Sequence, residues 1–197
     1  MGNFVPADNI DCKETLDMVK EAVKRANNII SRLLEYSRLP PPELFSCDIH
    51  TVIEDALLFA DSQFDLSGIN IVRDFSPEQI FVKADRSVLS QAFFNLIANS
   101  IEAMNSAGQI IIKTYKEANK CILAIEDTGC GISEQDLPKV FEPFFTTKMA
   151  QKHTGLGLSS VRLIIDRHSG AVNISSIQGK GATATVVLPA GDVNGSC

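Results

Sequence analysis

The sequence predicts an α+β fold, a two-layer sandwich in which a mixed, mostly antiparallel sheet packs on about three helices behind a long bundle helix. Two observations predict this class. Helical periodicity and strand-like runs occupy separate stretches, and most strand candidates follow one another across short turns, as in hairpins. A heptad pattern at the N-terminus is separated from the remainder by three prolines. The 197 residues are enough for one domain with a full core and an appendage.

Composition excludes several classes of protein. The net charge of −6 argues against non-specific nucleic-acid binding, so we expect no nucleic-acid partner. No apolar run approaches the roughly 18 residues that span a bilayer, so we expect no membrane contact and a cytoplasmic location for this segment. The five cysteines are scattered and form no C-x-x-C pair, which predicts reduced thiols and no structural zinc.

Residues 13–39 carry apolar side chains at heptad spacing, which is typical of a helix in a bundle. The stripe comprises Leu16, Val19, Val23, Ala26, Ile30 and Leu33. One helix cannot bury such a stripe alone, so this helix requires a partner. Three prolines at 40–42 end the helix and form a stiff linker. We therefore predict a partial bundle segment at 1–42, a domain at 43–190 and a tail at 191–197.

The domain alternates between short strand candidates and longer helical patterns. It begins with a strand candidate at 44–47, after which Asp48 is placed to cap a helix. The later elements are strands at 69–75 and 80–83, a helix at 86–104, strands at 109–115 and 121–126, a helix near 157–167, and strands at 171–177 and 182–188. This order of elements is the basis for the predicted sandwich.

The stretch from Cys121 to Ile132 is the first candidate for a binding site. An apolar strand ends at Asp127, and Gly129 and Gly131 follow within four residues. Without a Cβ, these glycines would let a flat ligand approach the backbone while Asp127 accepts a hydrogen bond from an exocyclic amine. The alternative is an ordinary Asp-Thr-Gly turn between a strand and the next element.

The second candidate is one face of the helix at 91–104. Gln91, Asn95, Asn99 and Glu102 are spaced by 4, 4 and 3 residues, so they share an arc of roughly 80° on that helix. A solvent-facing stripe would explain the same spacing. Oxygen ligands suit Mg²⁺, however, and one Asn carbonyl together with nucleotide phosphates is a sufficient site for that ion.

The third candidate combines the run FEPFFTTK at 141–148 with TGLGL at 154–158. Thr146, Thr147 and Lys148 offer hydroxyl groups and a positive charge to a phosphate. The glycines of the second run open a helix whose first backbone N–H groups can bind an anion. Packing in the core is the alternative for the phenylalanines of the first run.

The candidate stretches contain the blocks NLIANSIEA, DTGCGI, FEPFFTTK and TGLGL, and the sequence GKGATATVVLP follows them. In this order they resemble the N, G1, F and G2 boxes and the last strand of the catalytic ATP-binding domain of sensor histidine kinases. The resemblance covers about residues 43–190 and implies the Bergerat type of α+β sandwich. Residues 13–39 resemble, less specifically, the second helix of the dimerisation and phosphoacceptor hairpin of that family.

The resemblance implies a role for each matched position. Asp127 would bind the adenine amine, Asn99 would ligate Mg²⁺, and Lys148 would approach the triphosphate under a lid at 149–154. The implied nucleotide-binding positions are Asn95, Asn99, Asp127, Gly129, Gly131, Ile132, Phe145, Thr146, Thr147, Lys148, Thr154, Gly155, Leu156, Gly157, Leu158 and Thr183. The resemblance assigns Asn95 and Lys148 to catalysis as well, and it implies ATP and Mg²⁺ as the cofactors.

The sequence departs from the family at three points. His153 stands where a glycine is common, and Glu102 stands where many relatives have a lysine or an arginine. The phosphoacceptor histidine is missing, because none of His50, His153 and His168 has the acceptor pattern. The resemblance therefore implies a catalytic fragment of a two-component kinase, which transfers the γ-phosphoryl group to a histidine outside this chain and thence to a response-regulator aspartate.

The implied partners are ATP, the acceptor hairpin of the same parent kinase and a response-regulator receiver domain. A homodimer through residues 13–39 and a membrane anchor on the parent protein stay open. Three alternatives share the fold: an ATP-driven clamp, an ATP-sensing interaction module and a serine-kinase relative. Clamp ATPases place a water-activating Glu where this chain has Asn95, and an amide cannot act as a general base.

Overall fold

The computed structural model describes residues 15–16, 19, 43–104, 107–148 and 154–191. The chain divides into two compact units, Met1–Pro40 and Pro41–Cys197, and the boundary falls within the run of prolines. In the first unit the described residues are helical, and they include Leu16 and Val19 of the heptad stripe, both exposed. The other residues of the stripe, residues 192–197 of the predicted tail and residues 149–153 of the predicted lid lie outside the described part.

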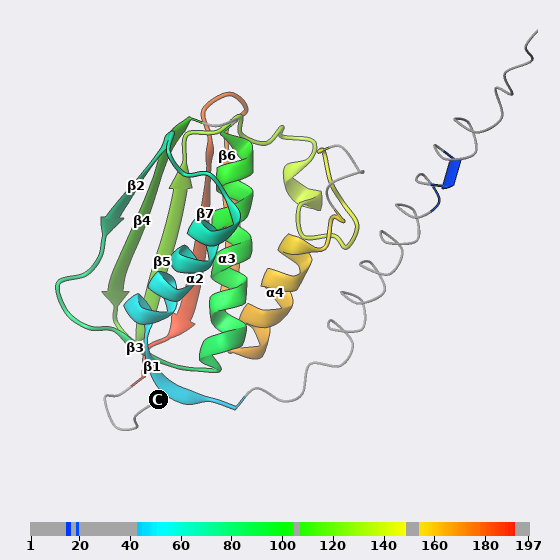
Figure 1. Cartoon of the computed structure of the whole chain (residues 1–197). Coiled ribbons are helices and arrows are strands. Elements are labelled where there is room, and N and C mark those ends of the chain that lie inside the picture. The colour runs from blue at the N-terminus through cyan, green and yellow to red at the C-terminus, as the bar shows by residue number, and fades with distance from the viewer. Residues whose placement is uncertain (1–14, 17–18, 20–42, 105–106, 149–153, 192–197) are drawn as a thin grey trace, which may run out of the picture. The chain divides into compact units, whose positions relative to one another are not determined.

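The second unit contains three α-helices, one 3-10 helix and seven strands among its described residues (Figure 1). In chain order they are β1 (Phe45–Asp48), α2 (Ile49–Gln63), β2 (Ile69–Asp74), β3 (Phe81–Ala84), α3 (Arg86–Ala103), β4 (Gly108–Glu117), β5 (Lys120–Asp127), η1 (Leu137–Lys139), α4 (Gly157–Arg167), β6 (Ala171–Ser176) and β7 (Ala182–Pro189).

The strands form a five-stranded sheet in the order β2-β4-β5-β7-β6 and a separate pair, β1-β3. The β2-β4 pair is parallel and the other pairs are antiparallel. Helices α2, α3 and α4 lie on one face of the large sheet (Figure 1). The predicted α+β sandwich with a mixed, mostly antiparallel sheet is therefore confirmed.

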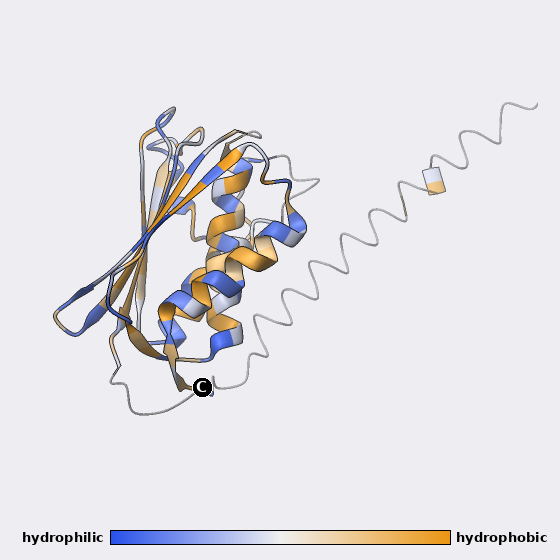
Figure 2. Cartoon of the chain, turned by 60° about the vertical axis from the view of Figure 1, so that its left-hand side comes forward, coloured by the Kyte–Doolittle hydropathy of each residue, from blue (hydrophilic) through white to orange (hydrophobic). Residues whose placement is uncertain are grey.

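The core lies between the sheet and the helices. Helix α3 is the central element, and Leu89, Phe93 and Ile97 on it are completely buried. Along β5, Leu123 and Ile125 point into this core because alternate residues of a strand face the same side. Apolar colouring accordingly follows the sides on which the helices and the sheet meet (Figure 2). Each such side chain stabilises the fold by about 1.5–3 kcal/mol.

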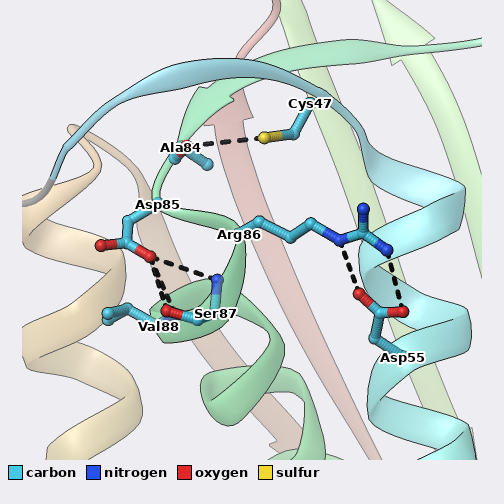
Figure 3. A network of polar contacts seen from close by, with 7 residues as sticks. All are labelled: Cys47, Asp55, Ala84, Asp85, Arg86, Ser87 and Val88. Carbon is cyan, nitrogen blue, oxygen red and sulfur yellow. Dashed lines mark hydrogen bonds and ion pairs between the residues drawn. The ribbon is translucent and has the colours of Figure 1, made fainter. Parts of the chain in front are cut away.

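A polar network fixes the start of α3 (Figure 3). Asp85 is the N-cap, and its carboxylate accepts hydrogen bonds from the backbone N–H groups of Ser87 and Val88. Arg86 binds Asp55 of α2 through two hydrogen bonds of 2.7 and 3.0 Å. The cap satisfies two of the free N–H groups at the helix start, and the ion pair links α3 to α2.

His168, directly after α4, connects that helix to the start of α3. It is 3% exposed, and its Nδ1 lies 2.7 Å from the carbonyl oxygen of Ile164. Its Nε2 lies 3.1 Å from the backbone N of Asp85. A backbone N–H can only donate, so Nε2 accepts, and the proton of a neutral ring sits on Nδ1 and donates to Ile164.

We expect His168→Ala to lower the free energy of unfolding by about 2–4 kcal/mol, because it leaves the N–H of Asp85 without its acceptor and opens a cavity. Urea denaturation followed by circular dichroism measures the change. Asp166→Ala, at an exposed position of the same turn, is the matched control and should change stability by less than about 0.5 kcal/mol. Equal effects of the two substitutions would contradict a linking role for His168.

Candidate functional site

The site begins at Asp127, the last residue of β5, which is 7% exposed. Its Oδ1 accepts hydrogen bonds from the backbone N–H of Gly129 at 2.9 Å and of Ala182 at 3.2 Å. Both bonds hold the same oxygen, so the carboxylate is oriented by the protein while Oδ2 is the oxygen left to accept a bond from a ligand. A buried carboxylate with one oxygen fixed in this way is suited to select a ligand that carries an N–H donor.

The two glycines after Asp127 are required by close backbone contacts. A Cβ on Gly129 would lie 2.7 Å from the Cβ of Ala103 at the end of α3. Gly131 has a φ of +66°, and a Cβ there would collide with the carbonyl oxygen of Ile177. These contacts explain the glycines without a ligand, and the floor that they would form under an adenine stays a prediction.

The β6–β7 turn fastens the loop that follows Asp127. The hydroxyl of Ser176 accepts from the N–H of Ile132 at 2.8 Å and donates to the carbonyl of Gly181 at 2.7 Å. The N–H of Gly179 donates to the carbonyl of Cys130 at 2.7 Å. Ser176 was not predicted from the sequence, because only the folded chain brings β6 against this loop.

Thr183 does not face Asp127. In the β5-β7 pair Asp127 is opposite Ala182, and Thr183 is opposite Glu126. Successive side chains of a strand point to opposite faces, so Thr183 lies on the face of the sheet that points away from the helices. We therefore leave Thr183 out of the proposed site, where the backbone N–H of Ala182 takes its place.

Asn99, on α3, supplies the most informative polar group of the site. Its Nδ2 is buried, and among the described residues it is the only buried side-chain nitrogen or oxygen that lacks a hydrogen-bond partner. A Cβ added to Gly157 would lie 3.9 Å from this atom, so the amide lies next to the start of α4. Leaving such a group without a partner costs about 1–3 kcal/mol, which a bound ligand would recover.

The N-terminus of α4 has anion-binding character. Leu156 occupies the N-cap position, and its side chain makes no capping hydrogen bond. The first backbone N–H groups of an uncapped helix carry partial positive charge and need acceptors. Either orientation of the neighbouring Asn99 amide is useful here, because its nitrogen can donate to a phosphate and its oxygen can ligate a cation. The residues present thus fit a nucleotide phosphate together with Mg²⁺.

Lys148 is held by an ion pair. Its Nζ lies 2.7 Å from Oε2 of Glu102 in the last turn of α3, and its backbone N–H donates to Thr146 Oγ1 at 3.2 Å. A triphosphate that binds the ammonium group of Lys148, as predicted, would therefore compete with Glu102 for that group or share it with Glu102. The structure thus pairs Lys148 with Glu102, one of the four residues on the predicted face of α3.

The remaining predicted positions differ in how deeply they are buried. Leu156 is buried, and Ile132, Phe145 and Leu158 pack partly against the core. The carbonyl of Gly155 accepts from the N–H of Phe144 at 2.9 Å, so the two predicted phosphate-binding runs lie side by side. Asn95 and Thr154 are half-buried, as is Thr146, whereas Thr147 is exposed.

Two of the cysteines predicted to be reduced have opposite environments. Burial is the main cause that raises the pKa of the Cys121 thiol to about 12, with a smaller contribution from the negative charge of Asp48. Cys121 is therefore an unreactive core residue in β5. Cys130 is exposed in the loop after Asp127. Within the described part of the chain, no group of three or more His, Cys, Asp and Glu side chains is arranged to hold a metal ion.

The fold and this arrangement fit a nucleotide-binding domain. The site combines an oriented, buried carboxylate at the end of a central strand, an amide nitrogen on α3 without a partner among the described residues, and a helix N-terminus whose N-cap makes no side-chain hydrogen bond. The model of the histidine kinase-, DNA gyrase B- and HSP90-like ATPases matches residues 84–192. The chain belongs to this ATPase family, whose sandwich is the Bergerat type predicted above.

The relatives are histidine kinases. The chain is 33% identical over 179 residues to the signal transduction histidine-protein kinase AtoS of Escherichia coli K12, a match of 90% of this chain and 29% of AtoS. It is 30% identical to the catalytic domain of histidine kinase ThkA, with a TM-score of 0.67 over 75% of this chain and 95% of that domain. ThkA in complex with the response regulator protein TrrA has 25% identity and a TM-score of 0.72 over 94% of this chain and 53% of that one.

These similarities confirm the predicted resemblance to the catalytic domain of sensor histidine kinases, and they do not favour the ATP-driven clamp. The chain spans less than a third of the length of AtoS. No helix among the described residues has the length and hydropathy that crossing a bilayer requires.

Proposed function

We propose that this chain is the ATP-binding catalytic part of a cytoplasmic two-component sensor histidine kinase. It transfers the γ-phosphoryl group of ATP to a histidine outside this chain, from which the group passes to a response-regulator aspartate. The observation that carries the proposal is the buried amide nitrogen of Asn99, which has no hydrogen-bond partner among the described residues and lies at the start of α4. An amide donor beside a helix N-terminus is suited to bind a charged ligand that is rich in oxygen atoms. ATP is such a ligand, and the family to which the chain belongs is one of ATPases.

The chemistry assigned to the chain is binding and positioning. Asp127 selects the adenine amine through its free oxygen, and the N-terminus of α4 binds phosphate oxygens. Asn99 would hold Mg²⁺ together with phosphate oxygens, and the bound ion would neutralise charge on the triphosphate. Asn95, one turn before Asn99, orients the terminal phosphate, and its amide activates no water. Positioning of this kind supplies most of the rate enhancement in phosphoryl transfer.

We assign the phosphoacceptor histidine to another segment, because none of the three histidines of this chain has the acceptor pattern. His50 stacks on Phe75 at 4.8 Å and its Nε2 lies 2.8 Å from Thr114 Oγ1, so its ring has a structural role. His168 is buried against α3 and α4, and His153 lies outside the described residues. We accordingly propose the acceptor hairpin of the parent kinase and a receiver domain as partners, with pairing through residues 13–39 as the route to a homodimer.

We expect the chain to leave itself unlabelled when incubated with labelled ATP and Mg²⁺, and to label an added acceptor hairpin that carries the phosphoacceptor histidine. The readout is a phosphate that is labile in acid and stable in base. A hairpin with His→Gln at the acceptor position is the control. Without docking of the hairpin the rate should fall by orders of magnitude, because the reaction then depends on a random encounter.

Two results would change the assignment. Acid-stable label on the chain alone would indicate a hydroxyl acceptor and a serine-kinase relative of this fold. Tight ATP binding with no transfer to any hairpin would indicate an ATP-sensing interaction module.

A further inference from the structure

Among the described residues, the Glu102–Lys148 ion pair is less exposed than the other ion pairs that a lysine or an arginine makes. Its Nζ–Oε2 distance is 2.7 Å, and its side chains are 26% and 32% exposed. The pairs Arg73–Glu54, Arg86–Asp55 and Lys113–Glu126 have side chains that are 39–47% exposed. Lower exposure weakens solvent screening, so the charges of Glu102 and Lys148 act more strongly on each other and on a bound ion.

The pair lies beside the proposed phosphate position. Glu102 follows Asn99 by three residues on α3, so the two side chains share a face of the helix. Asn99 in turn adjoins the start of α4. A polyphosphate bound there would meet the positive charge of Lys148 and the negative charge of Glu102 within one turn of the helix.

We propose that Glu102 is a positioning residue that acts through Lys148 and sets how strongly the site favours polyphosphate over the nucleoside alone. Glu102 holds the ammonium group next to the phosphate-binding face while the site is empty. When the phosphates bind, Lys148 exchanges the carboxylate for phosphate oxygens, and the carboxylate left behind repels them. Both effects reduce the binding free energy that each phosphate group contributes. This inference rests on the proposed function, because it requires a nucleotide at this site.

We expect Glu102→Gln to strengthen the binding of metal-free ATP by about 5- to 10-fold and that of ADP by less, while leaving adenosine unchanged. Calorimetric titration of the full chain in a chelating buffer measures all three. A merely structural role for Glu102 would change the three affinities together. Glu54→Gln removes a carboxylate from an ion pair of the same N–O length, 2.7 Å, between α2 and β2, and should leave the ATP-to-adenosine ratio at its wild-type value.

A double-mutant cycle with Lys148 tests the route of the effect. Lys148→Met should weaken the binding of ATP. In that background Glu102→Gln should strengthen ATP binding by less than it does in the wild type, because no ammonium group is freed and only the repulsion by the carboxylate is removed. Glu102→Asp retains the charge and should keep the ATP-to-adenosine ratio close to that of the wild type.

The two proposals can fail separately. Suppose that the wild-type protein binds both adenosine and ATP. If Glu102→Gln then leaves the ratio of the ATP and adenosine affinities unchanged, or weakens the binding of ATP, the role of Glu102 is overturned and the proposed function stands. If wild-type protein binds no adenine nucleotide, the proposed function is overturned together with this inference.

Discussion

Asp127→Asn is expected to weaken the binding of ATP by about 100-fold, which corresponds to about 2.7 kcal/mol. The Oδ1 of Asp127 is held by two backbone N–H groups, and the oxygen of an asparagine would keep those bonds. Its amide nitrogen would then occupy the position of Oδ2. Two donors would face each other where the carboxylate accepts a hydrogen bond from the adenine amine, and the amine would lose its partner in a buried site.

Calorimetric titration with ATP and with ADP measures this effect. Glu126→Gln is the matched control, since it neutralises the preceding residue of β5, which points to the opposite face of the sheet. The two variants should unfold at similar temperatures, so that loss of binding cannot be assigned to loss of the fold. An Asp127→Asn protein that binds ATP as the wild type does would remove Asp127 from the nucleotide site.

Asn99→Ala is expected to make nucleotide binding nearly independent of Mg²⁺ and to lower phosphotransfer to an added acceptor hairpin by at least about 100-fold. The substitution removes the one protein ligand proposed for the metal, and it also removes the buried polar atom that lacks a partner in the described structure. The free energy of unfolding should therefore fall little, because the alanine leaves no hydrogen-bonding group unsatisfied.

The decisive quantity is the ratio of the ATP dissociation constants measured with and without Mg²⁺. This ratio should approach one in Asn99→Ala. Gln91→Ala, on the same face of α3 two turns earlier and exposed, is the control that should keep the wild-type ratio. Asn95→Glu is a companion variant that installs a water-activating carboxylate and should raise the rate of ATP hydrolysis. Full metal dependence in Asn99→Ala would move the metal ligand elsewhere on α3.

Local patterns in the sequence determined the elements and much of the candidate site. The periodicity of residues 86–104 predicted α3, found at Arg86–Ala103, and the cap at Asp48 begins α2 as expected. Asp127 ends β5 as the alternation of apolar residues indicated. These features depend on side chains a few residues apart, which the sequence displays directly. The four boxes then indicated the candidate nucleotide-binding residues through the resemblance to the family.

The tertiary structure alone decided which of these residues meet. It put Ala182 opposite Asp127 and moved Thr183 to the other face, because the register of the β5-β7 pair, which joins residues 55 positions apart, sets which side chains share a face. It also brought Lys148 to Glu102, 46 residues apart, and the start of α4 to Asn99. Contacts over such separations depend on how the sheet and helices pack, and the spacing of residues along the chain carries no record of that packing.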